Sequence, residues 1–204
     1  MKIKIIKHPD ELNTCNTFSV DCLLWGTRKI PRTYGRIGFV PEEGFYLSMT
    51  CEESSPRRTY TESNSPVYRD SAMEVFFCFA PGGVFSDIYT NFEMNANGAL
   101  LAMYGASRDC RTAFPPDGIS QCNCRATVRE NDWRLSLFIP LSILEEIYGN
   151  LSLEAGSYFS LNFYKLSESS DIEHYASFSP VHAPVPDFHL PQFFERAELV
   201  RASE

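Results

Sequence analysis

Two glutamates lie within apolar, strand-like segments of the chain. Glu74 lies in residues 69–79, and Glu93 lies in residues 88–95. In the second segment, a period of two divides the side chains between the faces of a strand: Tyr89, Asn91, Glu93 and Asn95 on one face, and Ile88, Thr90, Phe92 and Met94 on the other. A phenol, two amides and a carboxylate on one face form a hydrogen-bonding surface that suits a neutral, hydroxyl-rich ligand.

Glu74 has apolar neighbours on both strand faces, so we expect its carboxylate to be partly buried and to need partners. Two interpretations are open. Glu74 accepts hydrogen bonds from ligand hydroxyls, or it forms a structural ion pair with an arginine such as Arg69 or Arg108. The polar face of residues 88–95 has a second interpretation as well, because one face of an antiparallel sheet is commonly solvated.

If the two segments are neighbouring strands, one possible register places Glu74 and Glu93 on the same face. Two carboxylates about 5 to 5.5 Å apart are the arrangement that a retaining glycosidase uses. A glycoside hydrolase acting on O-glycosyl bonds with this pair is therefore an alternative to a binding module. Aromatic rings in polar loop sequence favour sugar binding, because the apolar C–H faces of a sugar stack on them. Tyr68 and Phe188 are such residues, although packing of their loops against the core explains them equally well.

The secondary-structure elements that carry these residues are predicted to be short strands, separated by clusters of Gly, Pro, Ser and Asn. The expected strands are residues 2–7, 45–51, 73–80, 88–95, 99–104, 124–129, 133–139, 158–166 and 175–179. One short helix is expected after Pro140, ending at Gly149. This rhythm predicts an all-β fold, an antiparallel β-sandwich of jelly-roll type with one short helix, and a single domain over residues 1–204.

Two long segments are predicted to be loops. Residues 52–69 are polar and rich in Ser, Arg and Pro. Residues 179–192 carry prolines at 180, 184, 186 and 191, which favour an extended path without backbone hydrogen bonds. The second loop also holds His182, Asp187, Phe188 and His189, so it presents polar and aromatic groups from a stiffened backbone.

Composition excludes several classes of partner. The net charge of -8, with 18 basic residues scattered among 26 acidic ones, argues against nucleic acid and against an anionic membrane surface. Residues 1–8 lack the apolar core of a signal peptide, and no window approaches a membrane-spanning length. Seven cysteines at irregular spacing favour reduced thiols, and we therefore expect a cytoplasmic protein. Cys122 and Cys124 lack a second ligand pair, so no metal site is predicted.

Three blocks of sequence resemble the family 9 carbohydrate-binding modules, and more closely the family-9-like branch of stand-alone proteins. The match covers about residues 65–200. Its blocks are residues 70–77, residues 89–98 running on to Tyr104, Gly105 and Arg108, and residues 162–165 together with residues 186–194. Their order and spacing are more specific than any one block alone.

The resemblance implies a β-sandwich that holds a mono- or oligosaccharide, without catalysis, between two aromatic rings. Polysaccharides such as xylan are among the expected ligands. Counting back six residues from Glu74 and from Phe194 places Tyr68 and Phe188 where such modules carry their clamping tryptophans. The predicted sugar-binding residues are Tyr68, Glu74, Asn91, Glu93, Asn95, Arg108, Phe188 and His189.

Two departures from the family pattern follow from the same comparison. Glu93 falls where the better-known modules have an arginine, and Arg108 is the candidate for the missing positive group. Tyr and Phe also offer less stacking area than two tryptophans, which implies a weaker or altered sugar preference. Such modules often hold structural calcium; no Asp-rich loop with calcium-site spacing is present here, so no cofactor is predicted and calcium stays an open alternative.

Overall fold

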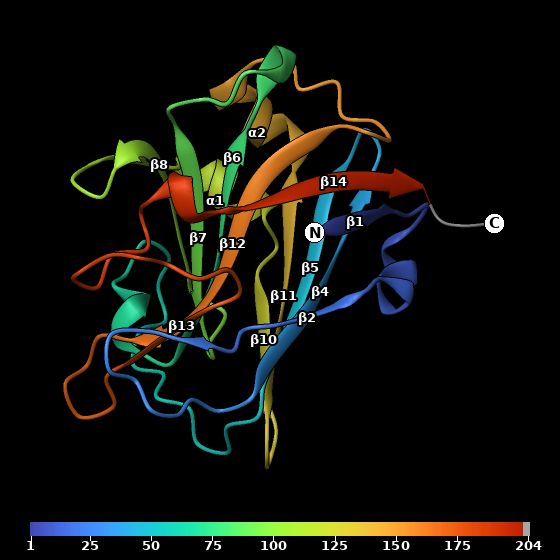
Figure 1. Ribbon diagram of the computed structural model, residues 1–204. Helices are drawn as coiled ribbons and strands as arrows, with labels where there is room; N and C mark the ends of the chain where they lie inside the picture. Colours follow the sequence, from blue (N-terminus) through green and yellow to red (C-terminus); the bar gives the residue numbers. More distant parts are fainter. Residues whose placement is uncertain (202–204) are drawn as a thin grey trace.

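The computed structural model describes residues 1–201, and strands make up most of its regular structure (Figure 1). The strands are β1 (Lys2–Ile5), β2 (Thr17–Ser19), β3 (Cys22–Leu23), β4 (Thr33–Val40), β5 (Gly44–Cys51), β6 (Ala72–Phe79), β7 (Tyr89–Asn95), β8 (Leu100–Ser107), β9 (Cys110–Ala113), β10 (Arg125–Val128), β11 (Trp133–Pro140), β12 (Tyr158–Ser167), β13 (His174–Ser177) and β14 (Glu195–Arg201). The helices are α1 (Pro116–Gln121) and α2 (Leu141–Tyr148), and short 3₁₀ turns cover Pro9–Thr14, Val67–Arg69, Pro81–Gly83 and Pro191–Phe193.

The strands join in one curled sheet with the order β10-β11-β5-β4-β1-β14-β12-β6-β7-β8-β9. Of the remaining strands, β2 pairs with β4, β13 with β12, and β3 with β13. Within residues 1–201, β1 runs parallel to both β4 and β14, and the other pairings are antiparallel. The predicted all-β sandwich is confirmed, with β1 as the exception to its antiparallel pairing. The helix predicted after Pro140 is α2, whose C-cap Gly149 has a φ of 75°.

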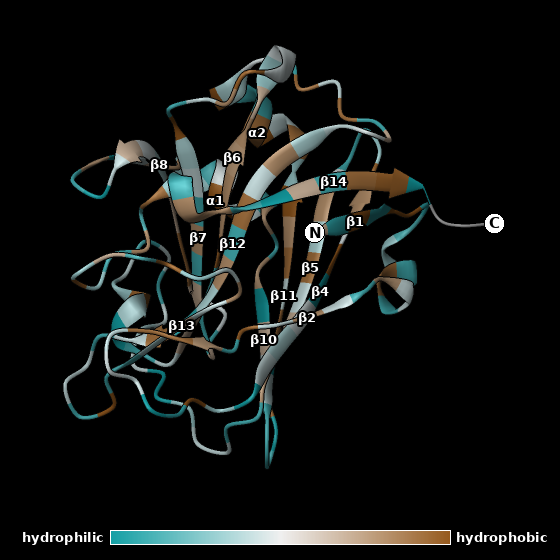
Figure 2. Ribbon diagram, in the orientation of Figure 1, coloured by the Kyte–Doolittle hydropathy of each residue, from teal (hydrophilic) through white to brown (hydrophobic). Residues whose placement is uncertain are grey.

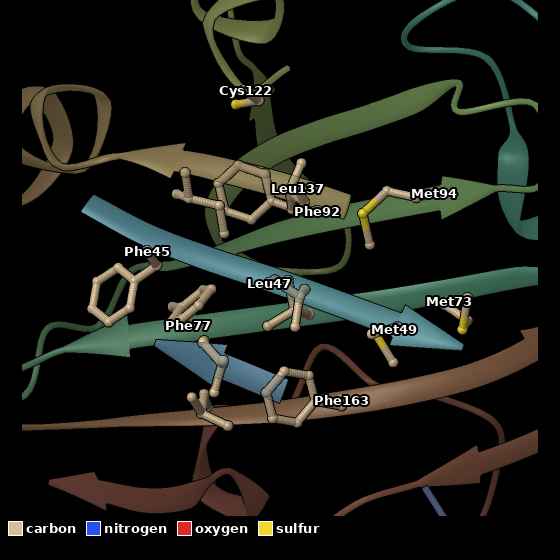
Figure 3. Close-up of a cluster of buried hydrophobic side chains, with 14 of the residues drawn as sticks. Phe45, Leu47, Met49, Met73, Phe77, Phe92, Met94, Cys122, Leu137 and Phe163 are labelled. Atoms are coloured by element: carbon tan, nitrogen blue, oxygen red, sulfur yellow. The ribbon is translucent and has the colours of Figure 1, made fainter. Parts of the chain in front are cut away.

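The main core lies between the layer of β11, β5 and β4 and the layer of β12, β6 and β7. Figure 3 shows side chains of both layers pointing toward one another, among them Phe45, Phe77 and Phe163. The ring centroids of Phe45 and Phe77 are 5.4 Å apart. In Figure 2 the strands carry most of the hydrophobic colour, while the loops at the lower end are largely hydrophilic. No helix in the described residues has the length and apolar character needed to cross a membrane.

Strand β6 is buried on both faces, which explains its unbroken apolar sequence. Met73, Val75, Phe77 and Phe79 face the main core. Ala72, Phe76 and Cys78 belong to a second apolar cluster, which also contains Val181 and Phe188 of the proline-rich loop 179–192. That loop therefore covers the outer face of β6, and Glu74, on the same face, lies beneath it.

The predicted strands do not include β4, whose two glycines are unusual inside a strand. Both glycines allow close approach of neighbouring side chains. A Cβ on Gly35 would lie 2.5 Å from the Ser48 carbonyl oxygen and 2.6 Å from Phe18 Cζ, and one on Gly38 would lie 2.8 Å from Ile6 Cδ1. Helix α1 is also absent from the prediction, and its sequence PDGISQ resembles a turn.

Replacing Gly35 by alanine is expected to lower the free energy of unfolding by roughly 1 to 3 kcal/mol, because backbone of β5 must move to admit the new methyl group. Gly118→Ala is the matched control, since the added Cβ meets its nearest neighbours at 3.7 Å, an ordinary contact. Urea unfolding of both variants checks this. Equal stability of the two variants would contradict the proposed packing.

The described residues contain seven cysteines, and all of them are free thiols. Cys110, at the tip of the β8–β9 hairpin, is the exposed member of the set. The cellular compartment stays a prediction from the sequence.

Candidate functional site

A pocket of about 130 Å³ lies on the outer face of β6 and β7, under the loop 179–192. Its charged lining consists of Glu74, Glu93, Glu168, Asp187, Arg108 and Arg111. Its aromatic lining consists of Trp25, Tyr68, Tyr175, Phe188 and His189. The chain thus brings six of the eight sequence-predicted residues to one pocket: Tyr68, Glu74, Glu93, Arg108, Phe188 and His189.

The two glutamates are direct cross-strand partners. The register of β6 and β7 pairs Glu74 with Glu93, and each residue is 2% exposed. Partners at such positions have Cβ atoms about 4.5 to 5.5 Å apart on one sheet face. Asn91 Nδ2 donates to Glu93 Oε1 at 3.0 Å. Oε2 of Glu74 and Oε2 of Glu93 are buried without a hydrogen-bond partner among the described residues.

Arg111 supplies a positive charge beside this pair. Its Nη1 lies 3.6 Å from Glu93 Oε1, and its side chain is 17% exposed. The Arg111 Nε donates to the Arg108 carbonyl at 2.9 Å, which holds the guanidinium in place. Its Nη1 has no hydrogen-bond partner among residues 1–201. The sequence prediction missed Arg111 because it depends on the tight β8–β9 hairpin, which returns the chain to the pocket.

Arg108, the arginine predicted from the sequence, has a different role in the geometry. Its Nη1 donates to the Pro186 carbonyl at 3.0 Å, and its Nη2 donates to Glu168 Oε1 at 3.1 Å. The residue therefore ties the proline-rich loop and the end of β12 to the β8–β9 hairpin. Arg108 lines the pocket, but both of these nitrogens already have protein partners.

Burial dominates the titration of the carboxyl pair. It raises the pKa of Glu93 to about 7, even though the Arg111 guanidinium acts in the opposite direction. Burial and the neighbouring charge of Glu93 raise the pKa of Glu74 well above its usual range. The desolvation of a carboxylate at this depth outweighs the attraction of an arginine at 3.6 Å. Near neutral pH the pair therefore retains at least part of its protons, and it can donate as well as accept hydrogen bonds.

The raised pKa of Glu93 predicts a specific pH dependence of stability. The folded state binds this proton more tightly than the unfolded chain, so the stabilisation is fully present below pH 4.5 and is lost as the pH rises to about 7. The loss amounts to roughly 3 kcal/mol across that window. Urea unfolding of the wild type and of Glu93→Gln at several pH values measures it. The difference in unfolding free energy between the two should change across the window, and a constant difference would contradict the raised pKa.

His189 is fixed at the rim of the second apolar cluster. Its Nδ1 lies 2.8 Å from Tyr89 Oη, and its ring centroid lies 5.0 Å from that of Phe76. Burial, together with the charges of Arg111 and Arg108, lowers the pKa of His189 to about 2. The imidazole is therefore neutral at physiological pH and acts as a fixed polar wall of the pocket.

The two predicted asparagines do not line the pocket. Asn91 supports Glu93 from the same strand face. Asn95 is bonded within the protein: its Nδ2 donates to Asp70 Oδ2 at 2.8 Å and to the Tyr60 carbonyl at 2.7 Å. Its Oδ1 accepts from the backbone N–H groups of Asn97 and Ala99. The structure thus places Asn91 beneath the site and assigns Asn95 to the anchoring of a loop.

The aromatic rings around the pocket differ in exposure. Phe188 is 6% exposed and stacks on Tyr164, with centroids 4.0 Å apart and an interplanar angle of 19°. Tyr68 and Trp25 are half-buried. Trp25, Tyr175 and Glu168 were missed by the sequence prediction. Trp25 reaches the pocket through the pairing of β3 with β13, a contact for which the sequence carries no local signal.

The described residues hold no grouping of three or more His, Cys, Asp or Glu side chains able to bind a metal ion. The pocket therefore offers hydrogen-bond donors, hydrogen-bond acceptors and aromatic surface.

A family model for carbohydrate-binding family 9 matches residues 8–199. The chain belongs to this family. A solved structure from Bacteroides uniformis ATCC 8492, provisionally described as a carbohydrate-binding protein, matches this family 9 chain with a TM-score of 0.81, 23% identity and 98% coverage of both chains. A family 9 module from Caldicellulosiruptor kristjanssonii in complex with cellotriose matches with a TM-score of 0.62 and 12% identity, over 100% of this chain and 96% of the other.

The Caldicellulosiruptor kristjanssonii module in complex with glucose matches with a TM-score of 0.59 and 11% identity, over 100% of this chain and 98% of the other. At these identities the solved structures show a shared fold. None of the curated proteins matches the family 9 chain.

Proposed function

We propose that the protein binds a mono- or oligosaccharide, without catalysis, in the pocket between Glu74, Glu93 and Arg111. The observation that carries this proposal is the set of unpartnered atoms there: two carboxyl oxygens and one guanidinium nitrogen, all buried. A hydroxyl group both donates and accepts hydrogen bonds, so it satisfies an orphan acceptor and an orphan donor at once. Adjacent hydroxyls on a sugar ring supply this chemistry repeatedly.

The aromatic lining supports the same ligand class. The C–H faces of a sugar are apolar, and Tyr68 presents a half-buried ring to the pocket that they can contact. Two family 9 structures with the same fold hold cellotriose and glucose, and neutral sugars are therefore the ligand class that we propose for this protein. A single site of this kind is expected to bind with a Kd between about 1 μM and about 1 mM.

The glycoside hydrolase alternative rests on the same carboxyl pair. A hydrolase needs one carboxylate that is ionised and a second group that keeps its proton. Here burial raises the pKa of both Glu74 and Glu93, so the direction of these shifts does not single out an ionised nucleophile. Family membership also favours binding. Binding is accordingly the function that we propose.

A glycan array probed with the purified protein tests this function. It should contain glucose, cello-oligosaccharides, xylan fragments, amino sugars and uronic acids. We expect retention on neutral glycans and a much weaker signal from Arg111→Met, which removes the orphan donor with a side chain of similar length. Absence of retention on every glycan would overturn the proposal. Equal retention by the wild type and Arg111→Met would place the sugar elsewhere on the protein.

A further inference from the structure

Little of the Phe188 ring is exposed to a ligand. One face stacks on Tyr164 at 4.0 Å, and the Trp25 ring lies 5.2 Å away at 47°. The residue as a whole is 6% exposed. A stacking contact with a sugar needs an open aromatic face, so a different ring of the pocket is required to stack on the sugar.

Trp25 is the larger, half-buried ring in the same lining. Its Nε1 donates to the Ala183 carbonyl at 2.8 Å, which ties the indole to the proline-rich loop. Its ring also meets Tyr175 edge-on, at 5.5 Å and 83°. These contacts hold the indole in one orientation at the pocket, so little conformational entropy is lost when a ligand binds.

The backbone at Trp25 is in an unfavourable conformation for a bulky residue. Trp25 has a φ of 49°, Gly26 has a φ of 81°, and the Thr27 N–H bonds to the Leu24 carbonyl at 3.0 Å. This is the pattern of a type I′ turn, whose first central position normally holds Asn, Asp or Gly. Strain of this kind persists where the surrounding structure enforces it, and it concentrates at functional sites.

Both ends of this turn are anchored to β13. The Leu24 N–H donates to the Tyr175 carbonyl at 3.0 Å, and the Tyr175 N–H donates to Thr27 Oγ1 at 2.9 Å. These two hydrogen bonds fix the turn against β13 and hold the Trp25 indole in the pocket lining.

We propose that Trp25 is the principal sugar-stacking residue of the pocket, and that Phe188 supports its ring rather than contacting the ligand itself. This inference rests on the proposed function and adds a binding residue from the N-terminal part of the chain. Tyr68 remains the second ring available to the sugar.

The wild-type protein provides a direct readout, because the chain has two tryptophans and the other, Trp133, is fully buried in the main core. A ¹⁵N-labelled sample therefore gives two indole N–H signals, assigned with Trp25→Phe. Titration with the array's strongest neutral glycan is expected to shift the Trp25 signal and to leave the Trp133 signal in place. This measurement needs no destabilised variant.

Binding measurements complete the test. Trp25→Ala is expected to weaken affinity for that glycan about tenfold or more. Tyr34→Ala removes a partly exposed ring on β4, outside the pocket lining, and is expected to bind like the wild type. If the wild type binds while the Trp25 signal stays still and Trp25→Ala keeps full affinity, the stacking role is wrong and the sugar-binding function stands. If the wild type binds no glycan, the proposed function itself fails.

Discussion

Glu74→Ala is expected to weaken sugar binding about 10- to 100-fold while the protein stays folded. Glu74 is buried at the floor of the pocket, and its Oε2 has no protein partner among the described residues. Removing this carboxyl leaves a buried ligand hydroxyl without its hydrogen-bond partner, which costs about 1 to 3 kcal/mol and corresponds to this loss of affinity. The free energy of unfolding should change by less than about 2 kcal/mol, because removal of an unpartnered buried carboxyl offsets part of the lost packing.

Glu146→Ala is the matched control for this prediction. Glu146 is exposed on α2, and its side chain makes no hydrogen bond or ion pair among the described residues. Calorimetric titration of both variants with the same glycan gives the affinities, and urea unfolding gives the stabilities. Wild-type affinity in a folded Glu74→Ala protein would show that the carboxyl does not contact the ligand.

Asp70→Ala is expected to lower the free energy of unfolding by roughly 3 to 5 kcal/mol, the largest stability effect predicted for the chain. Asp70 is fully buried. Its carboxylate accepts from the backbone N–H of Thr59 at 2.8 Å, from that of Tyr60 at 3.0 Å, and from Asn95 Nδ2 at 2.8 Å. Alanine removes the acceptor that these three donors share, of which Asn95 is buried, and it releases the loop 52–69 that leads to Tyr68.

Asp171→Ala provides the contrast. Asp171 pairs with Arg57 of the same loop through a bond of 2.8 Å, but its side chain is 65% exposed. Solvent screens such a pair, so the expected loss of unfolding free energy is at most about 1 kcal/mol. Chemical denaturation of both variants under one set of conditions compares them. Similar losses would mean that the buried acceptor at Asp70 does not organise the loop.

The parts of the fold that the sequence predicted are those where local pattern and burial agree. Residues 133–139 alternate cleanly and form β11. The helix after Pro140 has both end signals and forms α2. Strand β4 failed the same criteria because Gly35 and Gly38 are selected by the close approach of Phe18 and Ile6, which are distant in sequence. Strand β4 is therefore determined by tertiary packing, and this packing cannot be read from the local sequence pattern.

The residues of the candidate site also fall into two groups, those that the strand period predicts and those that depend on contacts between distant segments. Glu74 and Glu93 were predicted together because antiparallel neighbours that share a face follow from the period of two. Asn95 has the same strand phase, yet its partners lie in the loop 52–69. Arg111 depends on the exact length of the β8–β9 hairpin, and Trp25 depends on the pairing of β3 with β13. Neither feature is visible in residue spacing.

Sugar binding without catalysis is tested by a calorimetric titration of the wild-type protein with the neutral glycan that the array ranks first. The same sample is then assayed for newly released reducing sugar. The proposed function predicts one ligand per chain, a Kd between about 1 μM and about 1 mM, and no release of sugar. Absence of binding heat for every neutral glycan tested, or release of sugar that disappears in Glu74→Ala, would contradict it.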